Sequence, residues 1–160
     1  MTQTKHIRFH HAGSTTIPAS AKEIFPLLCP VREYEWVPNW QGKLIFSNSG
    51  LVETDCIFTT DHPQDGPAVW VTVNHDEARH QVEFIRFSPG IRIVRMALRV
   101  EQLQGTESRL HIAYTWTALG LTGQREISGF IASKGNELQH NIDHLGKLLG
   151  HFLTHGSMLE

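Results

Sequence analysis

The chain has 160 residues, of which 40 % are hydrophobic and 19 % carry a charged side chain, and its formal net charge is −2. This balance is typical of a globular protein with a core of its own, and it gives no electrostatic reason to expect nucleic acid or an anionic membrane as a partner. No apolar run approaches the roughly twenty residues that span a bilayer, and the first residues lack the apolar stretch of a secretory signal. We therefore expect a single domain over residues 1–160 that is cytoplasmic and does not insert into a membrane.

The first part of the chain predicts a strand and two short helices. Apolar and polar residues alternate over residues 5–16, which indicates a half-buried strand. Ser20 and Glu23 have the spacing of a capping box and predict the start of a short helix. Pro30 ends this helix, because the residue before a proline is pushed out of the α region. A second short helix is expected over residues 31–37.

A run of strands separated by turn sequences follows. The expected strands are 43–48, 55–60, 68–74, 81–87, 91–103 and 109–118. Their short connections predict an antiparallel meander. The two faces of the strand at 81–87 stay unassigned, because Glu83 and Arg86 interrupt a run of apolar residues there.

The last forty residues predict a long amphipathic helix over residues 121–155. Apolar side chains recur at helical spacing from Ile127 to Phe152, and this stretch contains no proline. Such a helix is about 45 Å long, so it needs a broad surface to lie on, and the sheet supplies it. Its glycines, Gly135 among them, would let it approach the sheet or bend. We expect the function to lie in the space between the helix and the sheet.

Two local sequences carry a resemblance to a known family. They are TIPASAKEIF at residues 16–25 and WVPNW at residues 36–40. Together with the order of the elements, they resemble the START-like (SRPBCC) superfamily, which includes polyketide cyclases, lipid-transfer domains and the birch-pollen allergen proteins. The resemblance implies an α+β helix-grip fold, with a curved seven-stranded antiparallel sheet around a long C-terminal helix, two short helices after the first strand and a deep apolar cavity. It supplies no family-wide catalytic motif, so the fold alone does not give the function.

Large side chains on the expected inner faces predict the lining of this cavity. The expected ligand-binding residues are Trp36, Trp40, Phe58, His62, Trp70, Met96, Tyr114, Trp116, Phe130 and Ile131. Large aromatic rings offer area to a flat or greasy ligand, although the same rings can simply fill a core. A buried Tyr114 hydroxyl would need a ligand or water as its partner, and His62 either contacts the ligand or lies in a solvent-exposed turn.

These features predict the binding of a small hydrophobic or aromatic molecule, either a lipid or a polyketide-like compound. The alternative is an enzyme of the polyketide cyclase or dehydratase type that acts on such a ligand in the same cavity. That chemistry needs an acid or base with a tuned pKa inside the cavity. The candidates are His62, Glu83, Arg86 and Tyr114, and the sequence assigns a catalytic role to none of them.

A third interpretation is an interaction protein that uses the outer face of the sheet. The alternation places charged residues there: Arg95, Arg99, Glu101 and Arg109. A charged face is unlike an obligate interface, so we disfavour this interpretation. A homodimer stays open.

The eleven histidines raise the question of a metal. Four of them recur in the last helix: His140, His144, His151 and His155. They fall opposite the apolar face of the helix, and no HExxH or Cys/His cluster accompanies them. The strand histidines also alternate with apolar residues and should point away from the cavity: His6, His10 and His111. We therefore expect no metal site and no cofactor, and we expect Cys29 and Cys56 to be buried free thiols.

Overall fold

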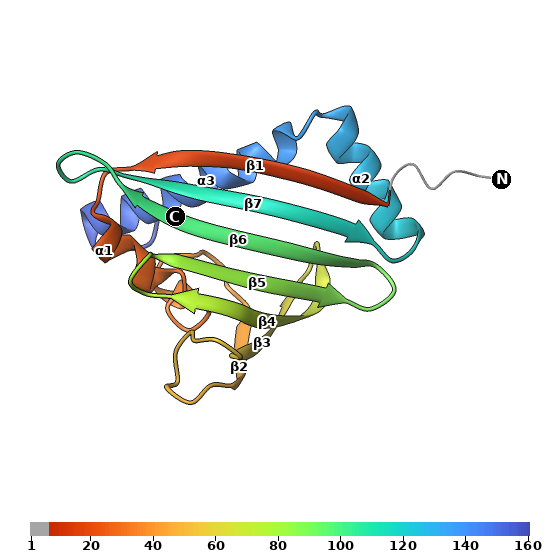
Figure 1. Cartoon of the computed structure of the whole chain (residues 1–160), viewed down its shortest axis with the longest axis horizontal. Coiled ribbons are helices and arrows are strands. Elements are labelled where there is room, and N and C mark those ends of the chain that lie inside the picture. The colour runs from red at the N-terminus through yellow and green to blue at the C-terminus, as the bar shows by residue number, and fades with distance from the viewer. Residues whose placement is uncertain (1–6) are drawn as a thin grey trace.

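The computed structural model describes residues 7–160 of the chain. Seven strands form one antiparallel sheet in the order β1-β7-β6-β5-β4-β3-β2 (Figure 1). The strands are β1 (Arg8–Ile17), β2 (Gly42–Phe46), β3 (Ile57–His62), β4 (Gly66–Asp76), β5 (Gln81–Ser88), β6 (Arg92–Gln102) and β7 (Ser108–Ala118). The helical elements are α1 (Ala21–Ile24), η1 (Phe25–Leu27), η2 (Glu33–Glu35), α2 (Leu121–Ala132) and α3 (Asn136–His155).

The α+β helix-grip fold that the sequence predicts is confirmed. Strands β2 to β7 pair with their neighbours in the sequence, and β1 closes the sheet against β7 from Arg8 opposite Thr117 to Ile17 opposite Ser108. The predicted strand at residues 5–16 corresponds to β1, although its first two residues, and with them His6, lie outside the described residues.

The two short helices follow β1 as expected. The Ser20 hydroxyl accepts a hydrogen bond from the Glu23 amide at 3.3 Å, so the predicted capping box does begin α1. The second helix is shorter than residues 31–37, because only the single 3₁₀ turn η2 forms there.

The C-terminal helix is in two parts, so the expectation of one uninterrupted helix over residues 121–155 is wrong in this detail. Gly135 has a φ of 80°, and its amide donates to the Phe130 carbonyl at 2.8 Å, which is the hydrogen-bond pattern of a helix C-terminus. A Cβ at residue 135 would lie 2.5 Å from His11 Nδ1, so glycine also permits a close approach to β1. Both parts still pack on the same face of the sheet, since Phe130 contacts Trp116 and α3 crosses β1 (Figure 1).

Strand β5 turns out to place Arg86 inward and Glu83 outward. Val82, Phe84 and Ser88 are buried, and the alternation puts Arg86 on their side. Glu83 lies on the other face and pairs with Arg95. The sequence could not assign these faces because apolar residues occupy both sides of the strand.

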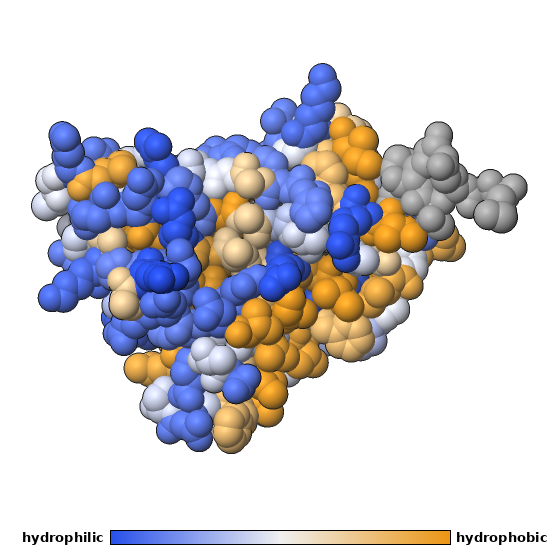
Figure 2. Space-filling view, viewed as in Figure 1, coloured by the Kyte–Doolittle hydropathy of each residue, from blue (hydrophilic) through white to orange (hydrophobic). Residues whose placement is uncertain are grey.

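The outer face of the sheet is only partly charged, which corrects the sequence-based expectation. Figure 2 shows hydrophilic residues over one end of the sheet and an apolar area over the other end. Exposed Val69, Val73 and Phe87 contribute to this apolar area. They face outward because the alternate residues of their strands, such as Trp70 and Thr72, are the buried ones.

The remaining sequence expectations concern histidines, cysteines and membrane helices. His140, His144 and His155 are exposed, as the helical wheel predicts, and within residues 7–160 no group of three or more potential metal ligands comes together.

Cys29 and Cys56 are buried and unpaired, as predicted. No helix in the described part of the chain is long and apolar enough to cross a membrane.

Candidate functional site

An enclosed apolar cavity lies between the inner face of the sheet, η2 and α3. Its volume is about 150 Å³. The lining residues are Leu28, Glu33, Trp36, Trp40, Phe58, Trp70, Phe84, Met96, Leu98, Leu110, Leu145 and Leu149. Aromatic and aliphatic side chains form almost the whole wall, so the cavity suits an apolar molecule.

The aromatic wall is held in place by hydrogen bonds outside the cavity. The indole Nε1 of Trp36 donates to the Leu27 carbonyl at 2.9 Å, and that of Trp40 donates to the Pro30 carbonyl at 2.8 Å. Trp70 donates to Thr60 Oγ1 at 2.9 Å. Because these three indole donors already have partners, the rings present apolar surface to the cavity in fixed orientations.

Glu33 is the one carboxylate on this wall. It belongs to η2, one turn before Trp36, and both side chains line the cavity. The described residues offer no hydrogen bond or ion pair to its side chain. Burial therefore raises the pKa of the Glu33 carboxyl to about 8. The sequence reasoning missed this residue, although its spacing of three from Trp36 placed it on the same side of a helical turn.

A second cavity of about 140 Å³ adjoins the first, and Trp70 and Met96 line both. Its lining residues are Asp65, Trp70, Arg86, Val94, Met96, Tyr114, Trp116, Leu138 and Asn141. Unlike the first cavity, it contains several hydrogen-bond donors.

Arg86 is the central residue of the second cavity. Register places it beside Trp70 on β4 and Val94 on β6, in the same row of the inner face as Trp116. Its Cζ lies 5.5 Å from the ring centroid of Trp70 and 5.0 Å from that of Trp116. The side chain is 11 % exposed, and its nearest carboxylate is Asp65, 3.7 Å from Nη1. This burial lowers the pKa of the guanidinium, but an arginine still keeps its charge.

Several donors in this cavity have no partner. Arg86 Nε, Arg86 Nη2 and Trp116 Nε1 are buried and make no hydrogen bond within the described part of the chain. Tyr114 is 7 % exposed, and burial raises the pKa of its phenol to about 12, so the hydroxyl keeps its proton. Buried donors are usually satisfied, so such a group of free donors is unusual.

Arg92, in the same sheet, is an arginine whose guanidinium nitrogens all have hydrogen-bond partners. Its Nε and Nη2 bind the two carboxylate oxygens of Glu126 at 2.7 and 2.8 Å. Its Nη1 donates to Ser88 Oγ and to the Asp65 carbonyl, both at 3.1 Å. All three nitrogens have partners, so Arg92 is a structural residue that joins β6 to α2.

The structure distributes the sequence-predicted site residues among several places. Trp36, Trp40, Phe58, Trp70 and Met96 line the first cavity, and Tyr114 and Trp116 line the second together with Trp70 and Met96. His62 lies at the end of β3 in a surface depression, where its ring is 5.4 Å from that of Trp40.

The two predicted residues of α2 lie apart from both cavities. Phe130 packs against Phe9 and Trp116 as part of the core. Ile131 follows about 100° further round the helix and is 40 % exposed. The helical spacing placed Ile131 within the apolar stripe and Phe130 at its margin, but in the structure Phe130 is the buried residue and Ile131 faces outward.

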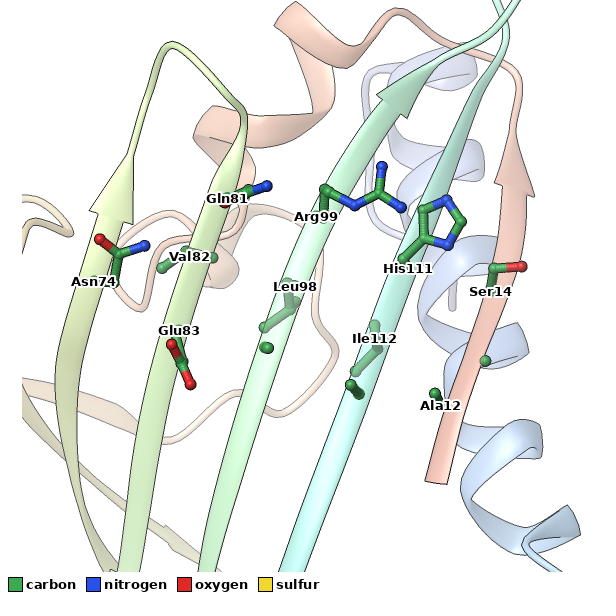
Figure 3. A pocket seen from close by; sticks show the side chains of 13 residues that line it. Ala12, Ser14, Asn74, Gln81, Val82, Glu83, Leu98, Arg99, His111 and Ile112 are labelled. Atoms are coloured by element: carbon green, nitrogen blue, oxygen red, sulfur yellow. The ribbon is translucent and has the colours of Figure 1, made fainter. Parts of the chain in front are cut away.

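A further hollow lies on the outer face of the sheet and has a volume of about 550 Å³ (Figure 3). It forms because Ala12, Ala113 and Ala97 lie in one register row and have short side chains. Figure 3 shows Arg99 pointing toward His111 beside this row. The hollow is open, and its acidic and imidazole groups have protein partners, since Glu83 pairs with Arg95 and His111 with Glu101. The two inner cavities are less open than this hollow and are therefore the better candidate for a binding site.

Comparison with known proteins gives structural matches only. No family model matches the chain, and no characterised protein matches it in sequence. Truncated norcoclaurine synthase from Thalictrum flavum aligns with a TM-score of 0.66 and 10 % identity, over 97 % of this chain and 99 % of its own. Ara h 8.0201 aligns with a TM-score of 0.61 and 13 % identity, over 92 % of this chain and 98 % of its own. The Zhui aromatase/cyclase from Streptomyces sp. R1128 aligns with a TM-score of 0.61 and 13 % identity, over 95 % of this chain and 99 % of its own.

The fold and the cavities define a helix-grip protein with an apolar interior site. The structural matches confirm the predicted helix-grip fold. At 10–13 % identity these matches show the fold alone, so the site has to indicate the function.

Proposed function

We propose that residues 1–160 form a single ligand-binding domain that holds a small apolar or aromatic molecule in the cavity between the sheet and α3. The observation that supports this proposal most directly is the enclosed cavity of about 150 Å³ with its fixed aromatic wall. A cavity of this kind inside a small protein reduces stability, because the wall loses packing contacts. A ligand-binding function would explain why the protein keeps this cavity despite its cost in stability.

The size of the cavity restricts the ligand. An engineered apolar cavity of about 150 Å³ in another protein binds benzene, whereas drug-sized ligands occupy about 300–1,000 Å³. We therefore favour a ligand with one ring or a short alkyl chain over a full-length lipid or a polyketide of several rings. One norcoclaurine synthase structure of the same fold holds dopamine and hydroxybenzaldehyde, which are ligands of this size class.

Two matched variants test this proposal. Leu145→Trp fills the inner cavity from α3, and Ala97→Trp fills the hollow on the outer face. Calorimetric titration with a panel of one-ring and short-chain compounds should show binding to the wild type and to Ala97→Trp. Binding to Leu145→Trp should be lost. Equal binding to both variants, or no binding of any compound to the wild type, would refute the proposal.

An enzyme of the cyclase or dehydratase type is the second candidate, and Glu33 is the observation that favours it. Such reactions need a group that takes and returns a proton inside the cavity. Glu33 lines the cavity with no side-chain partner among the described residues, and its raised pKa of about 8 lies near neutral pH. Of the four candidates from the sequence, Arg86 and Tyr114 line the second cavity, whereas Glu83 faces outward and His62 lies in a surface depression.

Hydrogen–deuterium exchange into a bound ketone tests the enzyme candidate. Benzylacetone in deuterated water should exchange its α-hydrogens about a hundredfold faster with the wild type than with Glu33→Gln, because a positioned base contributes at least that factor. The carboxylate takes the proton from the α-carbon, and the enolate then receives a deuteron from the exchanged carboxyl. Equal exchange rates for the wild type and Glu33→Gln would refute the enzyme candidate and leave ligand binding as the proposed function.

Two further expectations remain proposals. The unpaired, buried state of Cys29 and Cys56 supports a reducing compartment such as the cytoplasm. A homodimer is tested by sedimentation of the purified chain, where a single species of monomer mass at all concentrations would exclude it.

A further inference from the structure

We propose that the ligand carries a carboxylate, which binds to Arg86, Tyr114 and Trp116 while its apolar part occupies the neighbouring cavity. This inference rests on the proposed function and specifies the chemical class of the ligand. Nothing in the fold requires it, because the donors come from side chains of β5 and β7 in this particular sequence.

Arg92 and Arg86 differ in what the same two guanidinium nitrogens bind. Arg92 uses Nε and Nη2 to bind the two carboxylate oxygens of Glu126 at 2.7 and 2.8 Å. In Arg86 the same two nitrogens are buried and have no hydrogen-bond partner among residues 7–160. Nε and Nη2 form one edge of the planar guanidinium, and this edge matches the two oxygens of a carboxylate. Arg86 therefore has the geometry of an arginine whose carboxylate is supplied from outside the chain.

The charge balance leads to the same conclusion. Asp65 is the nearest acidic group, but its carboxylate is 49 % exposed and lies 3.7 Å from Arg86 Nη1, beyond hydrogen-bond distance. Glu126, the other acidic residue nearby, is already bound by Arg92. A buried guanidinium with so little compensation has lost much of its hydration, and an anionic ligand would restore that lost stabilisation.

The surroundings hold the guanidinium in place for this role. Trp70 and Trp116 flank it at 5.5 and 5.0 Å, and cation–π attraction to both rings limits its movement. Trp116 Nε1 and the Tyr114 hydroxyl add two neutral donors on the wall of the same cavity. Such a set of fixed donors in a site shielded from water binds an anion more strongly than a neutral carbonyl.

The arrangement of the two cavities sets the shape of the ligand. Trp70 and Met96 line both cavities, so the apolar site and the donor site are neighbours. A ligand with one ring or a short chain and a carboxylate on a short arm would occupy both. Hydrocinnamate has this shape and serves as the first probe.

The experiment compares each carboxylate with its uncharged amide. The probes are hydrocinnamate and hydrocinnamamide, hexanoate and hexanamide, and cyclohexylacetate and cyclohexylacetamide, titrated into the full chain at neutral pH. The wild type should prefer the carboxylate by about tenfold or more, the usual contribution of a charge-assisted hydrogen bond. Arg86→Met should lose this preference and keep the affinity for the amide. Arg95→Met, which removes an arginine from the outer face, should behave as the wild type.

A second variant and a free anion complete the test. Tyr114→Phe removes only the hydroxyl and should reduce the carboxylate preference severalfold, which keeps the inference testable if Arg86→Met does not fold. Acetate alone should bind far more weakly than hydrocinnamate, and equal binding would indicate a site for free anions and overturn the inference. Equal affinity for carboxylates and amides would also overturn it and leave the proposed function intact. Failure of every probe to bind would instead refute the proposed function.

Discussion

The guanidinium of Arg86 lies over the ring of Trp116, with Cζ 5.0 Å from the ring centroid, while the indole Nε1 of the same Trp116 has no hydrogen-bond partner in the described part of the chain. One residue thus holds the charge in place and also offers a free donor beside it. This pairing explains why a charged side chain can remain buried on β5. It also makes the stability of the protein a test of whether Arg86 has a structural or a binding role.

We predict that Arg86→Met changes the free energy of unfolding by about 1 kcal/mol or less, because replacing a poorly compensated buried charge with an apolar side chain is often neutral or stabilising. Arg92→Met, the matched change at the satisfied arginine, should cost about 3 kcal/mol, since it leaves Glu126 without its partner. Urea denaturation of both variants measures this difference. A loss for Arg86→Met as large as that for Arg92→Met would show that Arg86 holds the fold together.

Glu33 gives a prediction about pH. Its pKa rises from the ordinary value of 4.5 to about 8 in the native state. Between these two values the unfolded chain loses the proton while native Glu33 keeps it, so its contribution to stability falls as the pH rises and stays low above about 8. Glu33→Gln should therefore gain stability relative to the wild type as the pH increases. The gain should reach roughly 2 kcal/mol at alkaline pH, which is less than the full pKa shift implies, because Glu33 is only partly buried and solvent screens its charge.

Glu35→Gln provides the control for this prediction. Glu35 is exposed and paired with Arg32, which lowers the pKa of its carboxyl. Its substitution should leave the pH dependence above neutrality unchanged. Denaturant midpoints across the pH range give the comparison, and parallel curves for the wild type and Glu33→Gln would contradict the burial of Glu33.

The break between α2 and α3 can be tested with two glycines. Gly156 has a φ of 70° and open space around it, so Gly156→Ala should cost about 1 kcal/mol for the left-handed backbone alone. Gly135 has a φ of 80° and lies against His11, so Gly135→Ala should cost at least about 1 kcal/mol more. Thermal unfolding distinguishes them, and equal losses would mean that His11 moves aside freely.

The strands were predictable because their buried and exposed residues alternate with a period of two. In β7, for example, Ile112, Tyr114 and Trp116 are all buried, as expected. The capping box at Ser20 was predictable for a similar reason, since it depends only on local spacing. Gly135 was expected to let the helix bend or approach the sheet, but a complete break there was not predictable, because the apolar spacing continues through it and its closest contact, His11, is far away in the sequence.

The candidate site was predictable only in part. The tryptophans that line the cavities follow from strand alternation and from their place after the short helices. The inward direction of Arg86 depends on register with Trp70 across β4 and β5, which one strand with apolar residues on both faces does not reveal. Glu33 gains its raised pKa from the packing of α3 and the sheet around η2, and sequence spacing carries no information about that packing.

The most direct test of the account is a crystal structure of the full chain with hydrocinnamate. The account predicts the ring among Phe58, Phe84 and Leu145 in the inner cavity, with both carboxylate oxygens on Nε and Nη2 of Arg86. A ligand bound on the outer face beside Ala97 and Ala113, with the inner cavity unchanged, would contradict it.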